Sequence, residues 1–334
     1  MSERLLIVKL SALGDVIAAL PLATWIKSVH PDATIDWVIE KKWASLLKKH
    51  PAIDRTIAPD TKGSQRAIWT EIRALRTRRY DRVIDLQGNC KSALFTLFAR
   101  SRKKCGYRFK LAPEWPNSLV TNRKFPFKET LPLRAELEQI FTHLFNRPPP
   151  TIAFNLAASD SIKLPPKVGP LIMVSPFSRW SNKELSPKTL REFLVLLEKQ
   201  LKPTFILTVG TPQEKEKAHS AISGLRSAHI LGPLDLAAWQ GMIKEMDFVI
   251  TVDSASLHLT QTTSVPCFAI FGPSSSHIYS TSFSVQGGCP YGETFVKRCP
   301  RLRTCPTGAC LKDLTAKTLF NQFLEFAKCR VGAD

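Results

Sequence analysis

Residues 248–273 read FVITVDSASLHLTQTTSVPCFAIFGP, two apolar runs separated by a polar turn and a short segment of helical character. The runs, Phe248–Val252 and Pro266–Phe271, are too short for buried helices, and their β-branched and aromatic residues are typical of interior strands of a parallel sheet. The stretch therefore predicts a strand–helix–strand unit. Asp253 and Ser254 follow the carboxyl end of its first strand, which is the edge where open α/β sheets bind ligands.

The residues of this turn leave two interpretations open. In the first, Asp253 or Ser254 caps the following helix and His258 packs beneath it, which is the commoner role of such side chains. In the second, the turn and the N–H groups that begin the helix bind the phosphates of a ligand.

The stretch as a whole resembles a known donor-nucleotide motif. Residues 253–259, with Pro266 and residues 271–274, are similar to the motif of the ADP-heptose:lipopolysaccharide heptosyltransferases, glycosyltransferase family 9. The family usually carries glycine where this chain has Ala255, whose Cβ points into the turn. The resemblance implies that the donor is bound by Asp253, Ser254, Ala255 and His258.

Composition limits the class of protein. The 334 residues are enough for two domains, and 44% hydrophobic with 22% charged residues is ordinary for a globular protein. The net charge of +19 predicts a polyanionic partner, which is a nucleic acid, an anionic membrane face or an acidic glycolipid. No apolar run has the length of a membrane span, and the first residues lead directly into a strand rather than a signal-peptide core, so we expect a cytoplasmic protein with reduced cysteines.

The amino-terminal segment repeats the pattern of a strand followed by a polar turn. Residues 4–10 predict a buried strand, and residues 11–15 form a turn that feeds a helix. The glycine pattern is not G-x-G-x-x-G, which disfavours a dinucleotide-binding dehydrogenase. Asp15 on its own is explained as a first-turn carboxylate that complements the helix dipole. However, residues 9–21 closely resemble the opening motif of the heptosyltransferases, and this resemblance implies that Asp15 is the catalytic base.

Further strands in the first half predict a doubly wound parallel sheet. Residues 33–39 and 82–86 have strand character and alternate with helical patterns. The turn that follows, residues 87–92, resembles the strand-to-helix turn of the family and implies that Gln87 and Lys91 contact the acceptor. A solvated lysine at a helix start is a nearly equal explanation for Lys91.

Two basic runs stand out in the first half. Residues 62–82 predict a helix with Ile68, Ile72 and Leu75 on its apolar face and arginines presented to solvent, and residues 100–110 add a second run. Such runs are usually solvated faces, but an acceptor rich in carboxylates and phosphates would also explain them, because guanidinium groups bind both. The acceptor that the resemblance implies, Kdo sugars on phosphorylated lipid A, has this character. We therefore expect Lys62 and Arg66 to contact it.

Consecutive prolines in residues 146–150 predict a domain boundary, because they fit neither a sheet nor a helix interior. We expect an acceptor-binding domain at residues 1–147 and a donor-binding domain at residues 148–334, which also contains a cysteine-rich segment and a closing amphipathic helix at residues 311–326.

The second half restarts the alternation of strands and helices. Residues 171–175 predict a strand, and Ser186 with the following proline predicts a helix start. The intervening loop resembles the donor loop of the family, which implies that Lys183 stabilises the departing ADP and that Ser178 lies in the same site. Glu214 stands where the family binds the nucleoside, and a carboxylate can accept both hydrogens of a ribose diol. Leu234 is expected to line the adenine pocket.

Four cysteines, Cys289, Cys299, Cys305 and Cys310, lie close together in the sequence. Thiolates are suitable ligands for zinc or iron, but the spacing has no C-x-x-C pair. Similar cysteines occur in family members without a catalytic metal, so structural thiols are the favoured interpretation and a structural metal is the alternative.

The resemblance implies a GT-B architecture, α/β with two Rossmann-like doubly wound domains facing across a cleft. It implies inverting transfer of a heptose from ADP-L-glycero-D-manno-heptose to a Kdo or heptose hydroxyl of the lipopolysaccharide inner core, with the enzyme in the cytoplasm and peripheral to the inner membrane. No cofactor is expected to be required, and Mg²⁺ would at most stimulate. The alternatives are an autotransporter-type protein heptosyltransferase with a cysteine-bound metal and a basic nucleic-acid-binding protein. The latter would leave Asp15, Lys183 and Asp253 without a role and shows no known binding motif, so no nucleic-acid partner is expected.

Overall fold

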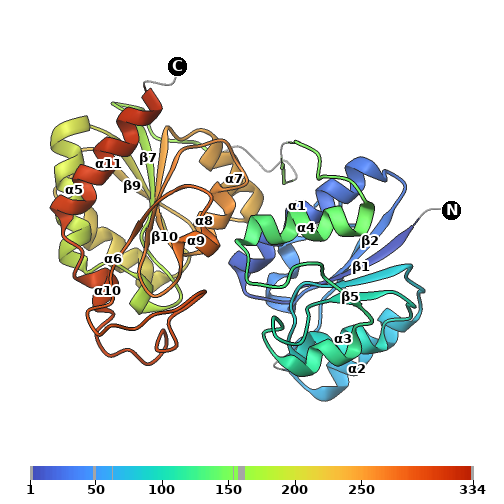
Figure 1. The fold of residues 1–334 in the computed structure, drawn as a ribbon. Coiled ribbons are helices and arrows are strands. Elements are labelled where there is room, and N and C mark those ends of the chain that lie inside the picture. The colour runs from blue at the N-terminus through green and yellow to red at the C-terminus, as the bar shows by residue number, and fades with distance from the viewer. Residues whose placement is uncertain (1–2, 48–49, 62, 153, 157–161, 332–334) are drawn as a thin grey trace. The chain divides into compact units, whose positions relative to one another are not determined.

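The computed structural model describes residues 3–47, 50–61, 63–152, 154–156 and 162–331, and the chain divides into two compact units, Met1–Ala157 and Ala158–Asp334. Each unit contains a six-stranded parallel sheet with interleaved helices (Figure 1). The predicted fold class, α/β with two doubly wound Rossmann-like sheets, is confirmed. The domain boundary predicted at residue 147 remains a prediction.

The sheet of the first unit has the strand order β3-β2-β1-β4-β5-β6, which is the Rossmann order. Its central strands are apolar and buried, as expected where helices cover both faces. The other strands of this sheet are shorter and depend more on pairing with their neighbours. The strands are β1 (Arg4–Val8), β2 (Thr34–Val38), β3 (Arg55–Ile57), β4 (Arg82–Asp85), β5 (Lys104–Gly106) and β6 (Arg123–Lys124).

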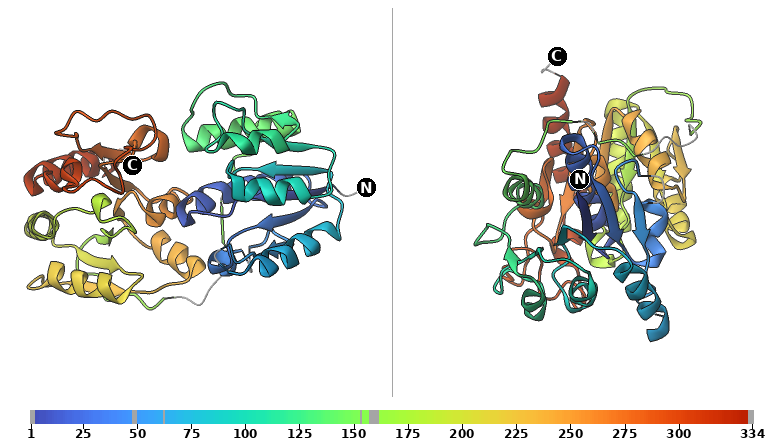
Figure 2. Two further views of the ribbon diagram at one scale, coloured as in Figure 1. Left: turned by 90° about the horizontal axis from the view of Figure 1, so that it is seen from below. Right: turned by 90° about the vertical axis from the view of Figure 1, so that its right-hand side faces the viewer.

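Different helices cover the two faces of this sheet (Figure 1). On one face lie α1 (Leu13–Val29) and α4 (Leu133–Phe145), where Trp25 packs edge-on against Phe141 with ring centroids 5.8 Å apart. On the other face, α2 (Gln65–Arg76) and α3 (Cys90–Phe98) lie beside each other, as Figure 2 also shows from below. The predicted apolar face of α2 is confirmed, because Ile72 and Leu75 are buried in this core. Two 3-10 helices, η1 (Lys41–Leu46) and η2 (Trp115–Val120), complete the unit.

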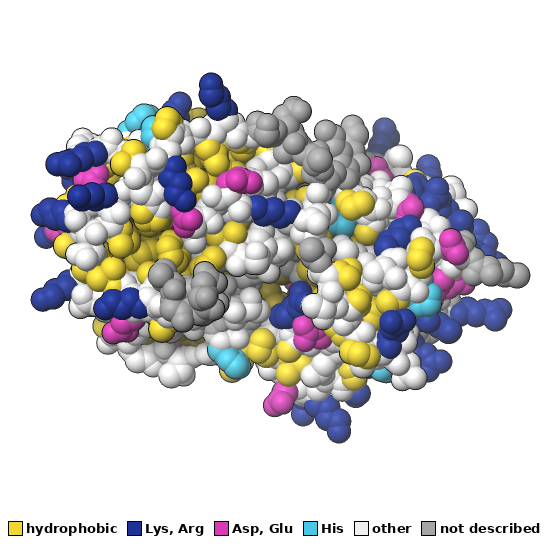
Figure 3. Space-filling model, turned by 90° about the horizontal axis from the view of Figure 1, so that it is seen from above, with side chains coloured by type: hydrophobic (Ala, Val, Ile, Leu, Met, Phe, Trp, Pro, Cys, Tyr) yellow, Lys and Arg dark blue, Asp and Glu magenta, His cyan; other side chains and the backbone are white. Residues whose placement is uncertain are grey.

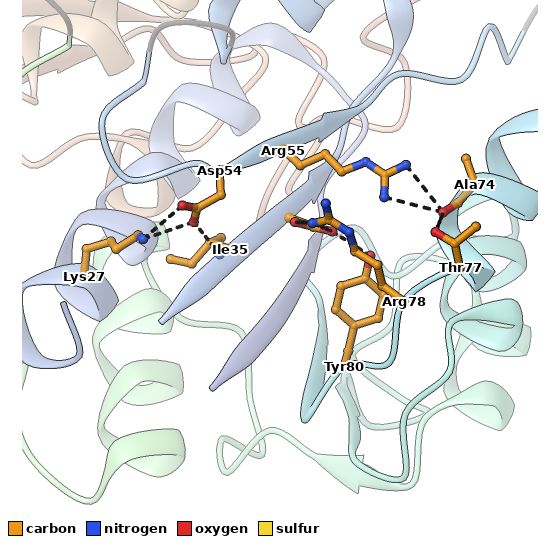
Figure 4. A network of polar contacts seen from close by, with 9 residues as sticks. Lys27, Ile35, Asp54, Arg55, Ala74, Thr77, Arg78 and Tyr80 are labelled. Atoms are coloured by element: carbon orange, nitrogen blue, oxygen red, sulfur yellow. Dashed lines mark hydrogen bonds and ion pairs between the residues drawn. The ribbon is translucent and has the colours of Figure 1, made fainter. Parts of the chain in front are cut away.

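A network of polar contacts ties β2 to the segment that follows α2 (Figure 4). The fully buried carboxylate of Asp36 accepts hydrogen bonds from the hydroxyl of Tyr80 at 2.8 Å and from Nη1 of Arg78 at 3.2 Å. Arg78, one of the arginines predicted to be presented to solvent, is still 38% exposed, but its pairing with a buried carboxylate was not predicted. The physical reason is that a buried carboxylate needs a positive or hydrogen-bonding partner.

The sheet of the second unit has the order β12-β11-β10-β7-β8-β9, which is again the Rossmann order when its strands are numbered from the first. The predicted strand–helix–strand unit is confirmed: β10 spans the predicted residues, α8 (Ala255–Thr260) follows, and β11 begins one residue later than expected. The strands are β7 (Leu171–Ser175), β8 (Thr204–Thr208), β9 (Ala228–Leu231), β10 (Phe248–Val252), β11 (Cys267–Phe271) and β12 (Phe283–Gln286).

One face of the second sheet is covered by α5 (Pro187–Leu201) and α11 (Ala316–Val331), which pack against each other. Phe193 of α5, Phe268 of β11 and Phe323 of α11 form an aromatic core there. The predicted start of α5 is confirmed, since Oγ of Ser186 accepts a hydrogen bond from the N–H of Thr189 at 3.0 Å. The remaining helices are η3 (Ser181–Lys183), α6 (Pro212–Ile222), α7 (Leu236–Lys244), α9 (Ser276–Tyr279) and α10 (Ala309–Lys312).

The closing helix differs from the prediction over residues 311–326. It is divided into α10 and α11, and the hydroxyl of Thr315 accepts a hydrogen bond from the N–H of Thr318 at the new helix start. Within the described part of the chain, no helix combines the length and the apolar character that a membrane span requires.

Candidate active site

Both sheets have a topological switch point, which is the place where the strand order reverses. The connections from the two adjacent strands there lead to opposite sides of the sheet, and ligands of open α/β folds bind in the crevice between them. In the first unit this point lies between β1 and β4, and in the second between β7 and β10. Most of the residues that the sequence singles out follow these four strands. Asp15, Gln87 and Lys91 belong to the first switch point, and Ser178, Lys183, Asp253, Ser254 and Ala255 belong to the second.

Asp15 lies in the first turn of α1, directly after the turn that leaves β1. Its Oδ2 accepts a hydrogen bond from the N–H of Ala12 at 3.2 Å, and the side chain is half-buried. A carboxylate in this position complements the helix dipole, as expected for an acidic residue in the first turn of a helix. The same position places it at the carboxyl edge of the sheet, where it can also take part in chemistry.

Gln87 connects the two turns of the first switch point. Its Oε1 accepts hydrogen bonds from the N–H groups of Leu10 at 3.1 Å and Ser11 at 3.0 Å. Its own turn is held by Asp85, a fully buried carboxylate that accepts from the N–H groups of Gln87 and Gly88, both at 2.9 Å. The backbone that carries Asp15 is therefore fixed to the turn after β4.

The buried carboxylate of Asp85 has two further donors. They are the hydroxyl of Thr96 at 2.8 Å and Nδ2 of Asn117 at 2.7 Å, the latter from η2. Four hydrogen bonds satisfy this anion, and no cation among the described residues pairs with it, which is how a carboxylate can remain buried.

A second buried chain of polar groups lies beside Asp15. The carbonyl oxygen of Leu86 accepts from the ammonium of Lys9 at 3.0 Å and from the hydroxyl of Tyr107 at 3.4 Å, and this hydroxyl also donates to Glu136 of α4 at 2.5 Å. Burial, followed by the carboxylate of Glu136, raises the pKa of Tyr107 well above its ordinary value, and Asp15 acts in the same direction. The tyrosine is therefore a neutral donor near Asp15.

The predicted cationic acceptor residues are exposed where they are described, whereas Gln87 is half-buried. Lys91 stands in the first turn of α3 and Arg66 in the first turn of α2, both at the surface. Lys62 lies outside the described residues. Lysine and arginine side chains also protrude over the face seen in Figure 3, with fewer acidic side chains among them. This distribution agrees with the net charge of +19.

In the second unit, the ammonium of Lys183 forms an ion pair with Asp253, with Nζ and Oδ2 2.5 Å apart. Both side chains are buried, so Lys183 is not an ordinary surface lysine. The hydroxyl of Ser274 also donates to Oδ2 of Asp253. Burial alone would raise the pKa of Asp253, but the charges of Lys183 and His258 and the hydrogen bonds from Lys183 and Ser274 outweigh it and leave the pKa below its ordinary value.

Ser178 lies beside this pair, in the loop after β7. Its N–H donates to Oε1 of Glu184 at 3.1 Å, and its hydroxyl lies 3.5 Å from the carbonyl oxygen of Asp253. Ser254 and Ala255 are half-buried at the start of α8, where Ser254 forms no side-chain cap. His258 is buried in the same helix, with its ring centroid 6.4 Å from that of Tyr279.

Glu214 and Leu234 follow the next two strands, β8 and β9. Glu214 is half-buried, and its Oε2 accepts a hydrogen bond from the N–H of Gly210 at 2.6 Å. Leu234 is half-buried just before α7. The two turns approach closely, because a Cβ added at Gly232 would lie 2.0 Å from the carbonyl oxygen of Val209, so only glycine fits there.

The cysteine-rich segment is tied to the loop that carries Lys183. Nδ2 of Asn182 donates to the carbonyl oxygens of Leu302 at 3.1 Å and Cys305 at 2.9 Å. The cysteines at 289, 299, 305 and 310 are half-buried free thiols. In the part of the chain that the structure describes, no three His, Cys, Asp or Glu side chains form a group arranged to hold a metal ion.

Sequence reasoning missed several residues that shape the turns at the two switch points. Ser274 stood within the quoted motif, but nothing in its type indicated that it would reach Asp253. Asn117, Tyr107 and Glu136 come from segments without a motif, and only the fold brings them to the first switch point.

Comparison with known proteins gives a consistent result. The model of glycosyltransferase family 9 (heptosyltransferase) matches residues 68–293. Lipopolysaccharide heptosyltransferase 1 of Escherichia coli O18:K1:H7 is 28% identical over 338 residues, covering 96% of this chain and 97% of that protein. The Pseudomonas aeruginosa protein of the same name is 28% identical over 283 residues, covering 81% and 79%. Among solved structures, E. coli heptosyltransferase WaaC with ADP has a TM-score of 0.75 at 24% identity over 97% of this chain and 98% of that one, which supports the GT-B fold.

Proposed function

The chain belongs to glycosyltransferase family 9 and is a heptosyltransferase of the lipopolysaccharide core, and from this premise we propose that it moves a heptose from ADP-L-glycero-D-manno-heptose to a Kdo or heptose hydroxyl of the inner core. The observation that supports the proposal most directly is the placement of polar side chains. Asp15 stands at the switch point of one sheet and the Lys183–Asp253 pair at that of the other.

We assign the donor to the second unit. The ammonium of Lys183 has three N–H donors, so it can hold Asp253 and still donate to a phosphate oxygen. Glu214 would accept hydrogen bonds from the ribose hydroxyls, and Leu234 would pack against the adenine. Ser178, Ser254, Ala255 and His258 complete the proposed donor site. Charge stabilisation of the leaving diphosphate by a fixed, buried cation is a large term in such reactions.

We assign the acceptor and the base to the first unit. The acceptor hydroxyl oxygen forms a bond to the anomeric carbon while the bond from that carbon to ADP breaks. The electron pair of the broken bond leaves with ADP, and the hydroxyl proton passes to the carboxylate of Asp15. A single displacement of this kind inverts the anomeric configuration. The ordinarily low basicity of a carboxylate suffices, because the attacking oxygen loses its proton as the leaving group departs.

Lys62, Arg66, Gln87 and Lys91 are proposed to hold the acceptor. Arg66 and Lys91 are exposed cations at the starts of neighbouring helices, and such groups suit the carboxylates of Kdo and the phosphates of lipid A. Gln87 uses its carbonyl oxygen to hold the turn that leads to Asp15, so its amide N–H groups are the part that would face a ligand.

No step of the proposed transfer uses a metal ion, since Lys183 supplies positive charge at the diphosphate. Mg²⁺ is expected at most to stimulate transfer by further screening of that charge. We also propose that the enzyme acts in the cytoplasm, at the inner membrane that carries its lipid-linked acceptor. Turnover measured with EDTA and then with added Mg²⁺ tests whether the transfer needs a metal ion.

The decisive experiment is incubation of the purified protein with ADP-heptose and a panel of acceptors: Kdo-lipid A, its heptosylated form and a protein acceptor of the autotransporter class. We expect release of ADP together with a heptosylated Kdo or heptose product of inverted anomeric configuration. Transfer to the protein acceptor alone, or retention of configuration, would contradict the proposal. Gel-shift binding to nucleic acid without affinity for ADP-heptose would support the nucleic-acid alternative instead.

A further inference from the structure

Large apolar side chains are exposed on one side of the first unit. Leu97 of α3 and Leu119 of η2 are 52% and 72% exposed, and Trp69, Phe109 and Trp115 are each more than 40% exposed. Single exposed apolar residues are common on protein surfaces, but a contiguous group of them indicates an interaction site.

Contacts between the elements that carry these residues place them side by side, since α3 contacts both α2 and η2. The ring of Trp69 in α2 packs against Phe98 of α3 with centroids 5.2 Å apart, and α3, which carries Leu97, lies against η2, which carries Leu119. The ring centroids of Phe109 and Trp115 are 5.6 Å apart. We call the surface formed by α2, α3, η2 and the loop of residues 107–115 the α3 face.

The side chain of Asn117 in η2 also holds this helix against the start of α3. Nδ2 of Asn117 donates to the carbonyl oxygen of Asn89 at 3.1 Å and to Oγ of Ser92 at 3.0 Å. η2 therefore cannot move away from α3 without losing buried hydrogen bonds, and the apolar side chains of both elements belong to one fixed surface. Helices α2 and α3 lie together on this side of the sheet, as Figures 1 and 2 show.

The elements that carry the apolar side chains also carry cations. The guanidinium of Arg76 lies 6.0 Å from the centroid of the Phe98 ring, within the range of a cation–π contact. Acidic side chains are fewer in residues 63–120: Glu71 is half-buried, Asp85 is buried, and Asp81 and Glu114 are exposed. The exposed cations on the elements of the α3 face are Arg66, Arg73, Arg76, Lys91, Arg108 and Lys110.

We propose that the α3 face docks on the surface of an anionic phospholipid bilayer. Aromatic and aliphatic side chains ringed by Lys and Arg are the composition that binds at the boundary of headgroups and acyl chains, and each cation near an anionic leaflet adds attraction. A nucleic acid would use the cations but would leave Leu97 and Leu119 in water. The inference rests on the proposed function, because Arg66 and Lys91, the proposed acceptor contacts, border the same face.

The test is sedimentation of the full chain with vesicles of phosphatidylethanolamine and phosphatidylglycerol, and with vesicles of phosphatidylcholine alone. Wild type is expected to sediment with the anionic vesicles and to be released by salt. The double variant L97E/L119E should lose about tenfold or more of this binding, because two apolar contacts are replaced by repelled carboxylates. The matched control is V168E/V296E, in which the same change is made at valines 75% and 67% exposed in the second unit. This control should bind as wild type does.

Unchanged binding of L97E/L119E, or equal loss in V168E/V296E, would overturn the proposal. So would wild type that binds duplex DNA but neither kind of vesicle. Circular dichroism and thermal unfolding confirm that each variant folds. Heptosyl transfer to a water-soluble, deacylated Kdo acceptor separates this inference from the proposed function. L97E/L119E should keep its turnover on that acceptor and lose it on Kdo-lipid A in vesicles, whereas failure of wild type on both acceptors would refute the proposed function and leave the vesicle result standing.

Discussion

The ammonium of Lys183 lies 2.5 Å from Oδ2 of Asp253, and more than nine-tenths of each residue is buried. The two residues come from the loop after β7 and the turn after β10, so the ion pair joins these two segments at the switch point of the second sheet. A pair of this kind differs from a surface salt bridge, because removing one partner leaves an uncompensated charge in a poorly solvated place. The same contact therefore contributes to the stability of the unit and holds the cation that we assign to the donor diphosphate.

Replacement of Lys183 by methionine should destabilise the second unit by about 3–5 kcal/mol, since methionine fills similar space but leaves Asp253 unpaired. Chemical denaturation measures this loss. The control is Lys217→Met, which removes an ion pair of 2.8 Å to Glu184 whose lysine side chain is 51% exposed. We expect a loss of less than about 1 kcal/mol there. Equal losses in the free energy of unfolding of the two variants would show that the buried ion pair is no more stabilising than the exposed one.

Acid should weaken the protein through the same carboxylate. The pKa of Asp253 in the folded state lies below its ordinary value of 3.8, although burial, the largest influence, acts in the opposite direction. The unfolded chain therefore takes up the proton first as the pH falls. The contribution of this group to stability is complete above the unfolded pKa and is lost as the pH falls through the folded pKa. Stability measured against pH should decline less steeply below pH 3.8 in Asp253→Asn than in wild type, and parallel curves would contradict this prediction.

Sequence reasoning predicted the elements whose own residues form a recognisable local pattern. Runs such as Phe248–Val252 are apolar, β-rich and bounded by polar turns, and the cap at Ser186 requires only its neighbours, so both were predicted to within a residue. The short strands β3, β5 and β6 were not predicted. Strands of two or three residues show no periodicity and form because neighbouring strands offer hydrogen-bonding partners.

The same distinction applies to the candidate site. Asp15, Lys183 and Asp253 were identified because motifs carry them, and the structure places each at a switch point. Their partners depend on contacts between distant segments. The approach of Ser274 to Asp253, and the pairing of Arg78 with the buried Asp36, arise from tertiary packing that the local pattern does not encode.

Asp85 should be important for stability because its buried carboxylate accepts four hydrogen bonds. Replacement by alanine would remove an acceptor of four hydrogen bonds and leave the Nδ2 group of Asn117 and the hydroxyl of Thr96 without this acceptor. Because each buried unsatisfied group costs about 1–3 kcal/mol, the loss should exceed about 3 kcal/mol. Thermal unfolding measures it, with Asp81→Ala at the exposed start of the same strand segment as a control. A similar small loss in both variants would contradict the assignment.

Cys305 should react more readily than Cys310 in the cysteine-rich segment. The N–H groups of Gly308 and Thr307 point at its sulfur and lower its pKa, whereas burial and the neighbouring cysteines raise the pKa of Cys310 to about 11. Only the thiolate is alkylated, so iodoacetamide should label Cys305 at a lower pH than Cys310. Cys90 is an informative control, because it is fully exposed but a hydrogen bond to Glu114 raises its pKa. Peptide mapping of the alkylated protein gives the order of labelling, and labelling of Cys90 before Cys305 would show that exposure alone decides it.

Replacement of Asp15 by asparagine should lower kcat by about 10²–10⁴, the usual contribution of a general base, while ADP binding stays close to that of wild type. The amide oxygen of asparagine can still accept the N–H of Ala12, so the start of α1 is kept and only the charge is lost. Weaker interaction with the helix dipole should cost no more than about 1 kcal/mol. The control is Asp235→Asn, which makes the same change at the start of α7, where the carboxylate accepts the N–H of Ala238 at 2.8 Å. Steady-state kinetics and calorimetric titration with ADP separate the two effects. If Asp15→Asn keeps near-normal turnover, Asp15 is not the base, and if both variants lose turnover equally, the loss reflects helix starts rather than proton transfer.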